Sequence, residues 1–232
     1  MRITAIIAAA GSSTRMGSGT NKLMSKVRGR HIFEICLFNL KKIEVVNEII
    51  IATSPALKAE FQKITEKTGQ AGIKFVSGGA TRSESVLNAL KAAEDADYIM
   101  IHDAARPLLS ASLASKMIEA IQNNEAVVPV LKSTDTLYHL DKESAYCLDR
   151  NKIFRIQTPQ LFNRNSISII RRALETENET YTDEASILLK NSVDIHFVKG
   201  SRYLHKLTYK EDLNYIESLY DSFIKYEAET GL

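Results

Sequence analysis

Short apolar runs rich in β-branched residues alternate with longer stretches of helical period, and this alternation limits the possible fold more than any other feature. Five runs are expected to be buried strands, at 3–8, 48–52, 74–76, 98–102 and 126–130. Four stretches between them are expected to be helices, at 31–41, 57–68, 83–93 and 112–123. The pattern predicts a Rossmann-like α/β fold, with a mostly parallel sheet and helices on both faces.

Residues 134–155 interrupt this alternation. Two short alternating segments, 136–140 and 146–150, flank the polar residues 141–144, which predicts a protruding β-hairpin arm. A lone hairpin is at best marginally stable in water, so we expect this arm to be a dimerisation arm that packs on a second copy of the chain. Helices near 165–176, 183–190 and from 210, with a strand at 195–199, complete a single domain over 1–232.

The charge balance is nearly neutral, with 30 Lys and Arg against 28 Asp and Glu and a formal net charge of +2. This bias is too weak to indicate nucleic acid or an anionic membrane as a partner. Gly11 ends the first apolar run long before it could span a bilayer. Cys36 and Cys147 lack metal-type spacing, and two reduced thiols are typical of a cytoplasmic protein.

A segment of small residues, AAAGSSTRMG at 8–17, follows the first predicted strand. Small residues allow backbone N–H groups to approach a polyphosphate closely, and Arg15 and Lys22 add positive charge nearby. The segment has neither the Gly-Lys-Ser/Thr of a Walker A loop nor the glycine spacing of a dinucleotide fingerprint. An ordinary turn flanked by two solvated cations is the alternative.

A second glycine-containing segment, GGATRSESV at 78–86, follows the third predicted strand. Ser83 is expected to cap the next helix. Gly79 and Ser85 could line a nucleotide-base pocket, although a well-capped turn alone would explain the same residues.

Asp103 ends the fourth predicted strand within IHDAARP at 101–107. A carboxylate in that position needs a cation or several donors to offset its desolvation. A Mg²⁺ ion that also carries nucleotide phosphates fits this need, and an ion pair with Arg106 fits it equally. The later segments LDRN, QTPQ, TDEAS and HKLT each have a local structural explanation as caps or turns.

Taken together and in this order, the segments resemble the 2-C-methyl-D-erythritol 4-phosphate cytidylyltransferases of the non-mevalonate isoprenoid pathway. The matching segments, between residue 5 and about residue 212, are AAAGSSTRMG with Lys22, GGATRSESV, HDAARP, STDT, LDRN, QTPQLF, TDEAS and KGSRYLHKLT. The resemblance implies one nucleotidyltransferase domain that transfers CMP from CTP to the acceptor phosphate and releases pyrophosphate. A cytidylyltransferase for another polyol phosphate, such as ribitol 5-phosphate, and a non-catalytic nucleotide-binding protein are the alternatives.

The resemblance also implies roles for individual residues. Arg15 and Lys22 match the basic pair around the triphosphate, and Asp103 matches the aspartate associated with a divalent metal, Mg²⁺. The family's positions around the base, ribose and phosphates of CTP correspond to Ala9, Ala10, Gly11, Gly79 and Ser85 of this chain. The family's residues that hold the acceptor phosphate correspond to Arg150, Thr182 and Lys206 of this chain. In the family the arm embraces a dimer partner, which implies that Arg150 acts on the partner's site in a homodimer.

The chain departs from the family pattern at three places. Tyr203 and Leu204 precede Lys206 where an acidic residue and Asn are frequent. Leu23-Met24 follows Lys22 where Gln and an aromatic residue are common, and Ala80 occupies a position that is often polar. These differences bear on acceptor identity and affinity more than on the type of reaction.

Overall fold

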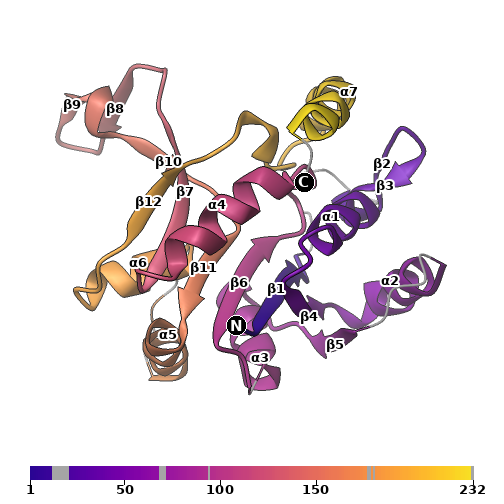
Figure 1. The fold of residues 1–232 in the computed structure, drawn as a ribbon. Helices are drawn as coiled ribbons and strands as arrows, with labels where there is room; N and C mark the ends of the chain where they lie inside the picture. Colours follow the sequence, from indigo (N-terminus) through magenta and orange to yellow (C-terminus); the bar gives the residue numbers. More distant parts are fainter. Residues whose placement is uncertain (12–20, 68–71, 94, 177–178, 180, 231–232) are drawn as a thin grey trace.

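A twisted eight-stranded sheet forms the centre of the computed structural model, which describes residues 1–11, 21–67, 72–93, 95–176, 179 and 181–230 (Figure 1). The strand order is β10-β7-β11-β6-β1-β4-β5, and β12, which lies off this path, also pairs with β7. The bounds are β1 Ile3–Ala9, β4 Val46–Thr53, β5 Ile73–Ser77, β6 Tyr98–Asp103, β7 Ala126–Lys132, β10 Phe154–Ile156, β11 Gln160–Asn163 and β12 His196–Lys199.

Strands β6, β1, β4 and β5 run parallel, and β12 runs parallel to β7. The predicted Rossmann-like, mostly parallel sheet is therefore confirmed. Two strands that the sequence pattern did not predict, β10 and β11, are antiparallel to their neighbours. Strand β11 lies between β6 and β7 and so joins the two parallel parts of the sheet.

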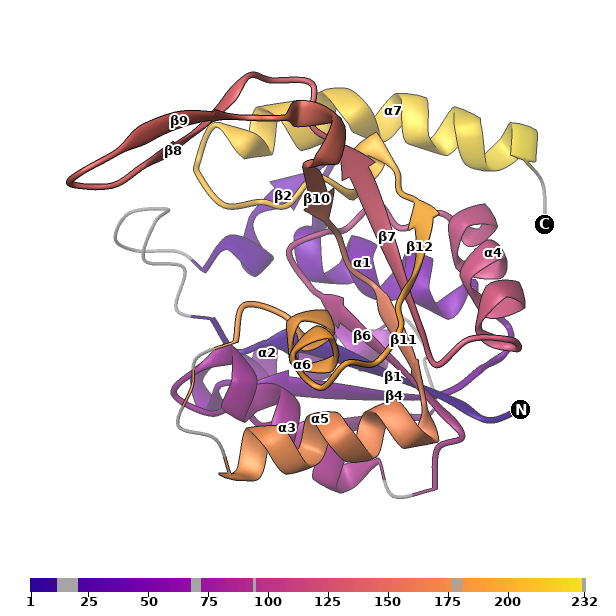
Figure 2. The ribbon, with the colours of Figure 1, turned by 90° about the vertical axis from the view of Figure 1, so that its left-hand side faces the viewer.

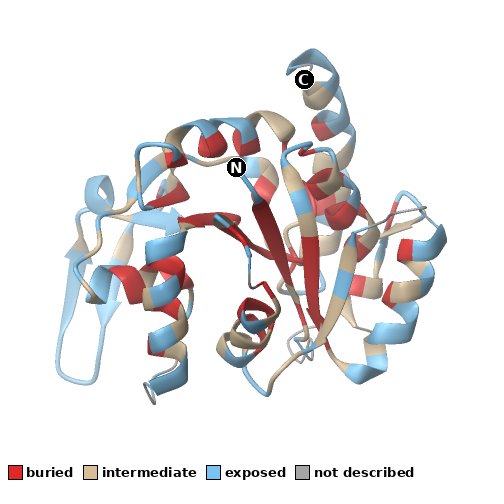
Figure 3. Ribbon diagram, turned by 60° about the horizontal axis from the view of Figure 1, so that its bottom comes forward, coloured by how far each residue is buried: buried red, intermediate tan, exposed pale blue. Residues whose placement is uncertain are grey.

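Helices cover both faces of this sheet, as a parallel sheet requires. Their bounds are α1 Ile32–Lys41, α2 Pro55–Lys67, α3 Arg82–Ala92, α4 Ala111–Ile121, α5 Arg164–Thr176, α6 Glu184–Lys190 and α7 Asp212–Thr230. Ile7 packs in the core under α1, α2, α4 and α7, whereas Ile6 packs in the core under α3, α5 and α6. Figure 2 shows α7 and α5 on opposite sides of the sheet, and Figure 3 shows the buried residues concentrated in its central strands.

The N-cap of helix α3 lies two residues earlier than the sequence pattern predicts. Thr81, not Ser83, is the N-cap, and its hydroxyl accepts a hydrogen bond from Glu84 N at 3.1 Å. Ser83 lies within the first turn, where its hydroxyl is 3.4 Å from Tyr181 O. Asp183, in the TDEAS segment, caps α6 by accepting from Ser186 N at 3.1 Å.

The hairpin predicted within 134–155 is present and projects from the sheet (Figures 1 and 2). Strands β8 (Leu137–Leu140) and β9 (Ala145–Leu148) pair antiparallel, and Asp141 closes the turn by accepting from the N–H groups of Glu143 and Ser144. Within the described chain, no helix combines the length and apolar character needed to cross a bilayer.

The remaining elements are short. A 3₁₀ turn η2 (Lys22–Met24) leads into the two-stranded ribbon of β2 (Lys26–Val27) and β3 (Arg30–His31). A second, η3 (Arg150–Lys152), lies at the base of the arm, and a third, η4 (Arg202–Leu204), follows β12.

Candidate active site

A cleft of about 460 Å³ lies at the carboxyl ends of β1 and β6, beside the loop that follows β5. Ligands of open α/β sheets bind at this edge, and the volume falls in the usual range for small-molecule sites. The cleft brings together eight residues that the sequence predicted for the site: Ala9, Ala10, Gly11, Lys22, Gly79, Ser85, Asp103 and Lys206.

Two other predicted site residues, both described, do not line the cleft, and for a third no position is described. Arg15 lies outside the described residues. Arg150 is exposed in η3 at the base of the arm, and Thr182 is exposed just before α6. Their expected roles therefore remain predictions.

The glycines at 78 and 79 allow two loops to meet at one wall of the cleft. A Cβ on Gly78 would collide with the Cβ of Ala10, so only glycine fits between the two loops. Gly79 N donates to the Ser85 hydroxyl at 3.0 Å, and that hydroxyl donates to Thr81 O at 2.9 Å. Ser85 therefore fixes the backbone that forms this wall.

Asp103 joins two cations at the floor of the cleft. Lys206 Nζ lies 2.7 Å from its Oδ2, and Arg82 Nε lies 3.1 Å from its Oδ1. The Asp103 side chain is only 9% exposed, which by itself raises the pKa of a carboxyl group. Arg82 and Lys206 outweigh burial and hold the pKa of Asp103 below its usual range, so the group is a carboxylate at neutral pH.

The Asp103–Arg106 ion pair considered as an alternative is not formed. The Arg106 side chain instead donates from Nη1 to Leu204 O at 2.6 Å, while its backbone N–H closes the turn to Asp103 O at 2.9 Å. Arg106 thus fastens the segment that leads to Lys206.

Glu184 and Arg82 are the charged pair that sequence reasoning missed. Two hydrogen bonds, of 2.6 and 3.1 Å, join the Arg82 guanidinium to the two carboxylate oxygens of Glu184, whose side chain is 2% exposed. Arg82 is the first residue of α3, where a cation opposes the helix dipole. That unfavourable position is a signal in the sequence that Arg82 needs acidic partners.

Lys22 and the Lys206 segment are joined across the cleft. Lys22 Nζ donates to Leu207 O at 2.9 Å, and Leu207 N donates to Ala105 O at 2.9 Å. The two lysines therefore reach the cleft from segments about 180 residues apart in the sequence.

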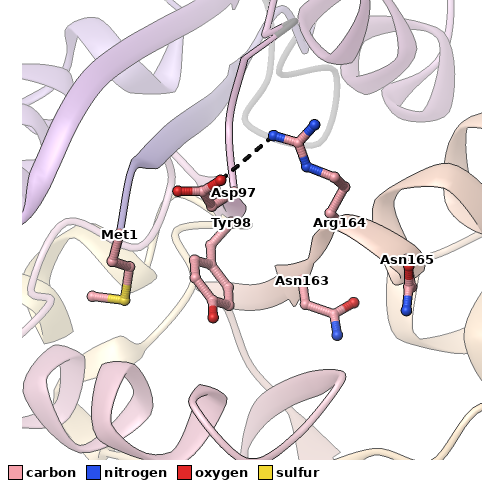
Figure 4. A pocket seen from close by; sticks show the side chains of 6 residues that line it. All are labelled: Met1, Asp97, Tyr98, Asn163, Arg164 and Asn165. Atoms are coloured by element: carbon pink, nitrogen blue, oxygen red, sulfur yellow. Dashed lines mark hydrogen bonds and ion pairs between the residues drawn. The ribbon is translucent and has the colours of Figure 1, made fainter.

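A second depression, of about 440 Å³, lies at the amino end of β6, on the opposite edge of the parallel strands (Figure 4). It is lined by Met1, Asp97, Tyr98, Asn163, Arg164 and Asn165. Its charged groups pair with each other, with Arg164 Nη2 3.5 Å from Asp97 Oδ1. By contrast, the cleft at the carboxyl ends of β1 and β6 has both the position and the convergent charges of an active site.

The family model for 2-C-methyl-D-erythritol 4-phosphate cytidylyltransferase matches residues 3–221. The chain belongs to this family. A 2-C-methyl-D-erythritol 4-phosphate cytidylyltransferase from Thermotoga neapolitana is 35% identical over 212 residues, covering 90% of this chain and 92% of the relative. A solved structure of a 4-diphosphocytidyl-2C-methyl-D-erythritol synthase from Anaerococcus prevotii has a TM-score of 0.82 at 28% identity, covering 94% of this chain and 98% of that one.

Some relatives are longer than this chain. The solved bifunctional IspDF from Campylobacter jejuni has a TM-score of 0.77 at 29% identity, and the match covers 92% of this chain but 54% of the bifunctional one. The chain thus spans about half the length of that bifunctional relative.

Proposed function

We propose that this chain transfers CMP from CTP to 2-C-methyl-D-erythritol 4-phosphate, giving 4-diphosphocytidyl-2-C-methyl-D-erythritol and pyrophosphate. The observation that carries the proposal is the meeting of Lys22, Asp103 and Lys206 in one cleft, in a chain of the cytidylyltransferase family. The three residues come from three separate segments and supply the charges that a reaction between two phosphates needs.

The reaction is an in-line displacement at the α-phosphorus of CTP. An oxygen of the acceptor phosphate forms the new P–O bond, and the bond to the β-phosphate breaks as pyrophosphate leaves. Because both reactants are anions, catalysis consists mainly of alignment and neutralisation of charge. Lys22, together with Arg15, stabilises the charge that develops around the α-phosphate, and Lys206 holds the acceptor phosphate. The acceptor phosphate is already a nucleophile, so the reaction needs no general base.

Asp103 is the residue that would hold a divalent cation. In the described part of the chain no group of three His, Cys, Asp or Glu side chains could form a complete metal site. Mg²⁺ commonly takes one or two protein carboxylates together with phosphate oxygens and water, and an ionised Asp103 lining the cleft fits that arrangement. Bound there, Mg²⁺ would neutralise charge on the triphosphate.

The wall formed by Gly79 and Ser85 favours a small base. Backbone groups fixed by the Ser85 hydroxyl leave little room to adapt, because Gly78 already lies against Ala10. A cytosine ring fits beside such a wall, whereas a purine would have to displace it. The co-substrate is therefore CTP in preference to ATP or GTP.

A homodimer completes the site in this proposal. Large apolar side chains are exposed on the arm and on β10 and β12 beside it: Tyr138, Leu140, Tyr146, Phe154, Ile156 and Phe197. Burying them on a second copy removes this apolar surface from water. Arg150 lies at the base of the arm and would reach the partner's cleft, where it and Thr182 hold the acceptor phosphate with Lys206.

The remaining expectations are a single nucleotidyltransferase domain and a cytoplasmic location. Cys36 and Cys147 are both free thiols, which suits a reducing compartment that also supplies CTP. Residues 3–221, which match the family model, include every residue proposed here for the site.

Pyrophosphate release from CTP with a panel of acceptors tests the proposal. We expect release with 2-C-methyl-D-erythritol 4-phosphate, little with ribitol 5-phosphate, and little when ATP or GTP replaces CTP. A preference for ribitol 5-phosphate would favour the polyol-phosphate alternative. Binding of CTP without release with any acceptor would favour the non-catalytic alternative.

A further inference from the structure

The turn at 157–160, with the sequence QTPQ, carries three polar side chains that are almost completely buried. Gln157 and Thr158 are each 5% exposed and Gln160 is 0% exposed. None of the three is among the residues that line the cleft. Thr158 and Gln157 bind the segments that contribute Asp103 and Lys206 to it, and Gln160 binds the start of α6, which lies outside the lining. Buried polar groups need hydrogen-bond partners. Here the partners belong to segments whose relative positions determine the geometry of the site.

Thr158 binds the end of β6. Its hydroxyl oxygen accepts from Asp103 N at 3.0 Å and lies 3.1 Å from His102 Nδ1. His102 Nε2 is 3.0 Å from Arg106 O, and a carbonyl can only accept, so Nε2 carries the proton. Nδ1 therefore accepts from the Thr158 hydroxyl, which donates once and accepts once.

The protonation state of His102 agrees with this pattern. Burial is the main cause that lowers the pKa of His102 to about 4, so the imidazole is neutral at pH 7. A neutral ring has one donor and one acceptor, and both are used within this network.

Gln157 binds the segment that leads to Lys206. Its amide Nε2 donates to Ser201 O at 2.8 Å, and its Oε1 accepts from Ser201 N at 3.0 Å. The approach is so close that a Cβ on Gly200 would collide with Gln157 Oε1. The side chain therefore acts like a neighbouring strand for the backbone at Ser201.

Gln160 binds the start of α6. Its Nε2 donates to Asp183 Oδ2 at 2.8 Å, and its Oε1 accepts from Ala185 N at 3.1 Å. These two residues flank Glu184, which holds Arg82 and through it Asp103.

We propose that Gln157, Thr158 and Gln160 are positioning residues that hold the Lys206 segment, the Asp103 backbone and the start of α6 in one fixed arrangement. The inference rests on the proposed function, because it concerns the same site. A misplacement of about 1 Å can cost about 100-fold in rate, so a turn that touches no substrate can still control turnover.

The first test replaces Thr158 with Val, which keeps the shape and removes the hydroxyl. Partners that orient a metal-associated group typically contribute about 10–100-fold, so we expect kcat/KM to fall by about that factor and the Mg²⁺ concentration for half-maximal rate to rise. Thr158→Ser retains the hydroxyl and should restore both. Thr53→Val is the matched control, because Thr53 is 1% exposed and its hydroxyl has no hydrogen-bond partner among the described residues.

Gln157→Leu should give a different signature. It releases the Ser201 backbone and hence the Lys206 segment, so we expect the KM for the acceptor to rise about tenfold while the KM for CTP changes little. A merely structural role would lower stability in both variants without separating the effects on metal, CTP and acceptor. This variant also keeps the inference testable if Thr158→Val does not fold.

Amide hydrogen exchange supplies a readout that needs no turnover. We expect exchange at Asp103 N–H to accelerate in Thr158→Val and to stay unchanged in Thr53→Val. If the wild type is inactive but its Asp103 amide is protected from exchange, the proposed function is wrong and the positioning role of Thr158 still stands. A folded Thr158→Val protein with wild-type kcat/KM, Mg²⁺ dependence and exchange at Asp103 would overturn the inference.

Discussion

Four charged side chains of alternating sign, Glu184, Arg82, Asp103 and Lys206, run in a row from the interior to the cleft. Each acidic group lies between or beside cations, which offsets the desolvation that a single buried charge would suffer. Burial lowers the pKa of Arg82, but Glu184 and Asp103 more than compensate and raise it above its usual range. The orientation of the Asp103 carboxylate therefore depends, through Arg82, on Glu184, which lies outside the cleft lining.

Glu184→Gln should destabilise the fold. The change leaves the half-buried Arg82 guanidinium with a weaker partner, and loss of a charge-assisted hydrogen bond costs about 1–3 kcal/mol. Urea denaturation measures the difference. Glu179→Gln is the control, because the Glu179–Lys190 pair has exposed side chains and should change stability by less than about 0.5 kcal/mol. Equal, small effects of both changes would show that the buried pair is not important for stability.

Asp212→Asn should lower stability at neutral pH and not in acid. Partial burial raises the pKa of Asp212, but hydrogen bonds from Tyr209 N–H and His205, with a further one from Thr208 N–H, lower it overall. A lowered folded-state pKa means that the carboxylate stabilises the fold above the unfolded value of about 3.9, and that this stabilisation is lost as the pH falls below it.

We expect the variant to be about 1 kcal/mol less stable than the wild type at pH 7, with the gap closing as the pH falls below about 4. Urea denaturation of both proteins across this range gives the comparison. A gap that does not depend on pH would contradict the role assigned to the charge.

At the scale of elements, the sequence predicted those with a clear period and missed those formed by long-range pairing. Strands β1, β4, β6 and β7 are largely buried apolar runs, β5 is an only partly buried edge strand, and all five lie where they were expected. Strands β10 and β11 have three and four residues on either side of Pro159, too few for a readable pattern, and their pairing with β7 brings together distant segments.

The same reason divides the predicted and missed site residues. Gly79 and Asp103 were found because they follow strands, and parallel strands place their carboxyl ends at one edge. Arg82 and Glu184 are 102 residues apart, and only the folded chain brings them into contact. The local sequence pattern cannot reveal an ion pair between residues so far apart in the sequence.

The arm provides a test at the scale of a single element. The double change Leu140→Ser and Tyr146→Ser removes two apolar side chains that are 73% and 52% exposed in the isolated chain. We expect light scattering to show a shift from dimer to monomer, with a loss of activity because Arg150 no longer reaches a partner's cleft. Ile224→Ser on α7, which is 43% exposed, is the control and should leave both unchanged. A monomer with full activity would end the role in trans proposed for Arg150.

At the scale of the whole molecule, two hydrophobic cores hold the sheet edge on which the cleft is built. Ile7 and Ile6 are adjacent in β1 but belong to opposite cores, and both are 0% exposed. Packing on both faces therefore fixes β1, and the strand leads directly into residues 9–11, which line the cleft. Loops at that edge can then present charged groups in a constant arrangement, which is what a reaction that depends on alignment requires.

The most direct test of the central claim is the turnover of Lys22→Ala with CTP, Mg²⁺ and 2-C-methyl-D-erythritol 4-phosphate. Removing a preorganised cation beside the transferred phosphoryl group should lower kcat by about 10²–10³-fold while the melting temperature stays close to that of the wild type. Lys58→Ala, which removes an exposed lysine of α2, serves as the matched control and should leave kcat unchanged. If Lys22→Ala keeps a turnover close to that of the wild type, the cleft described here is not the site of cytidylyl transfer.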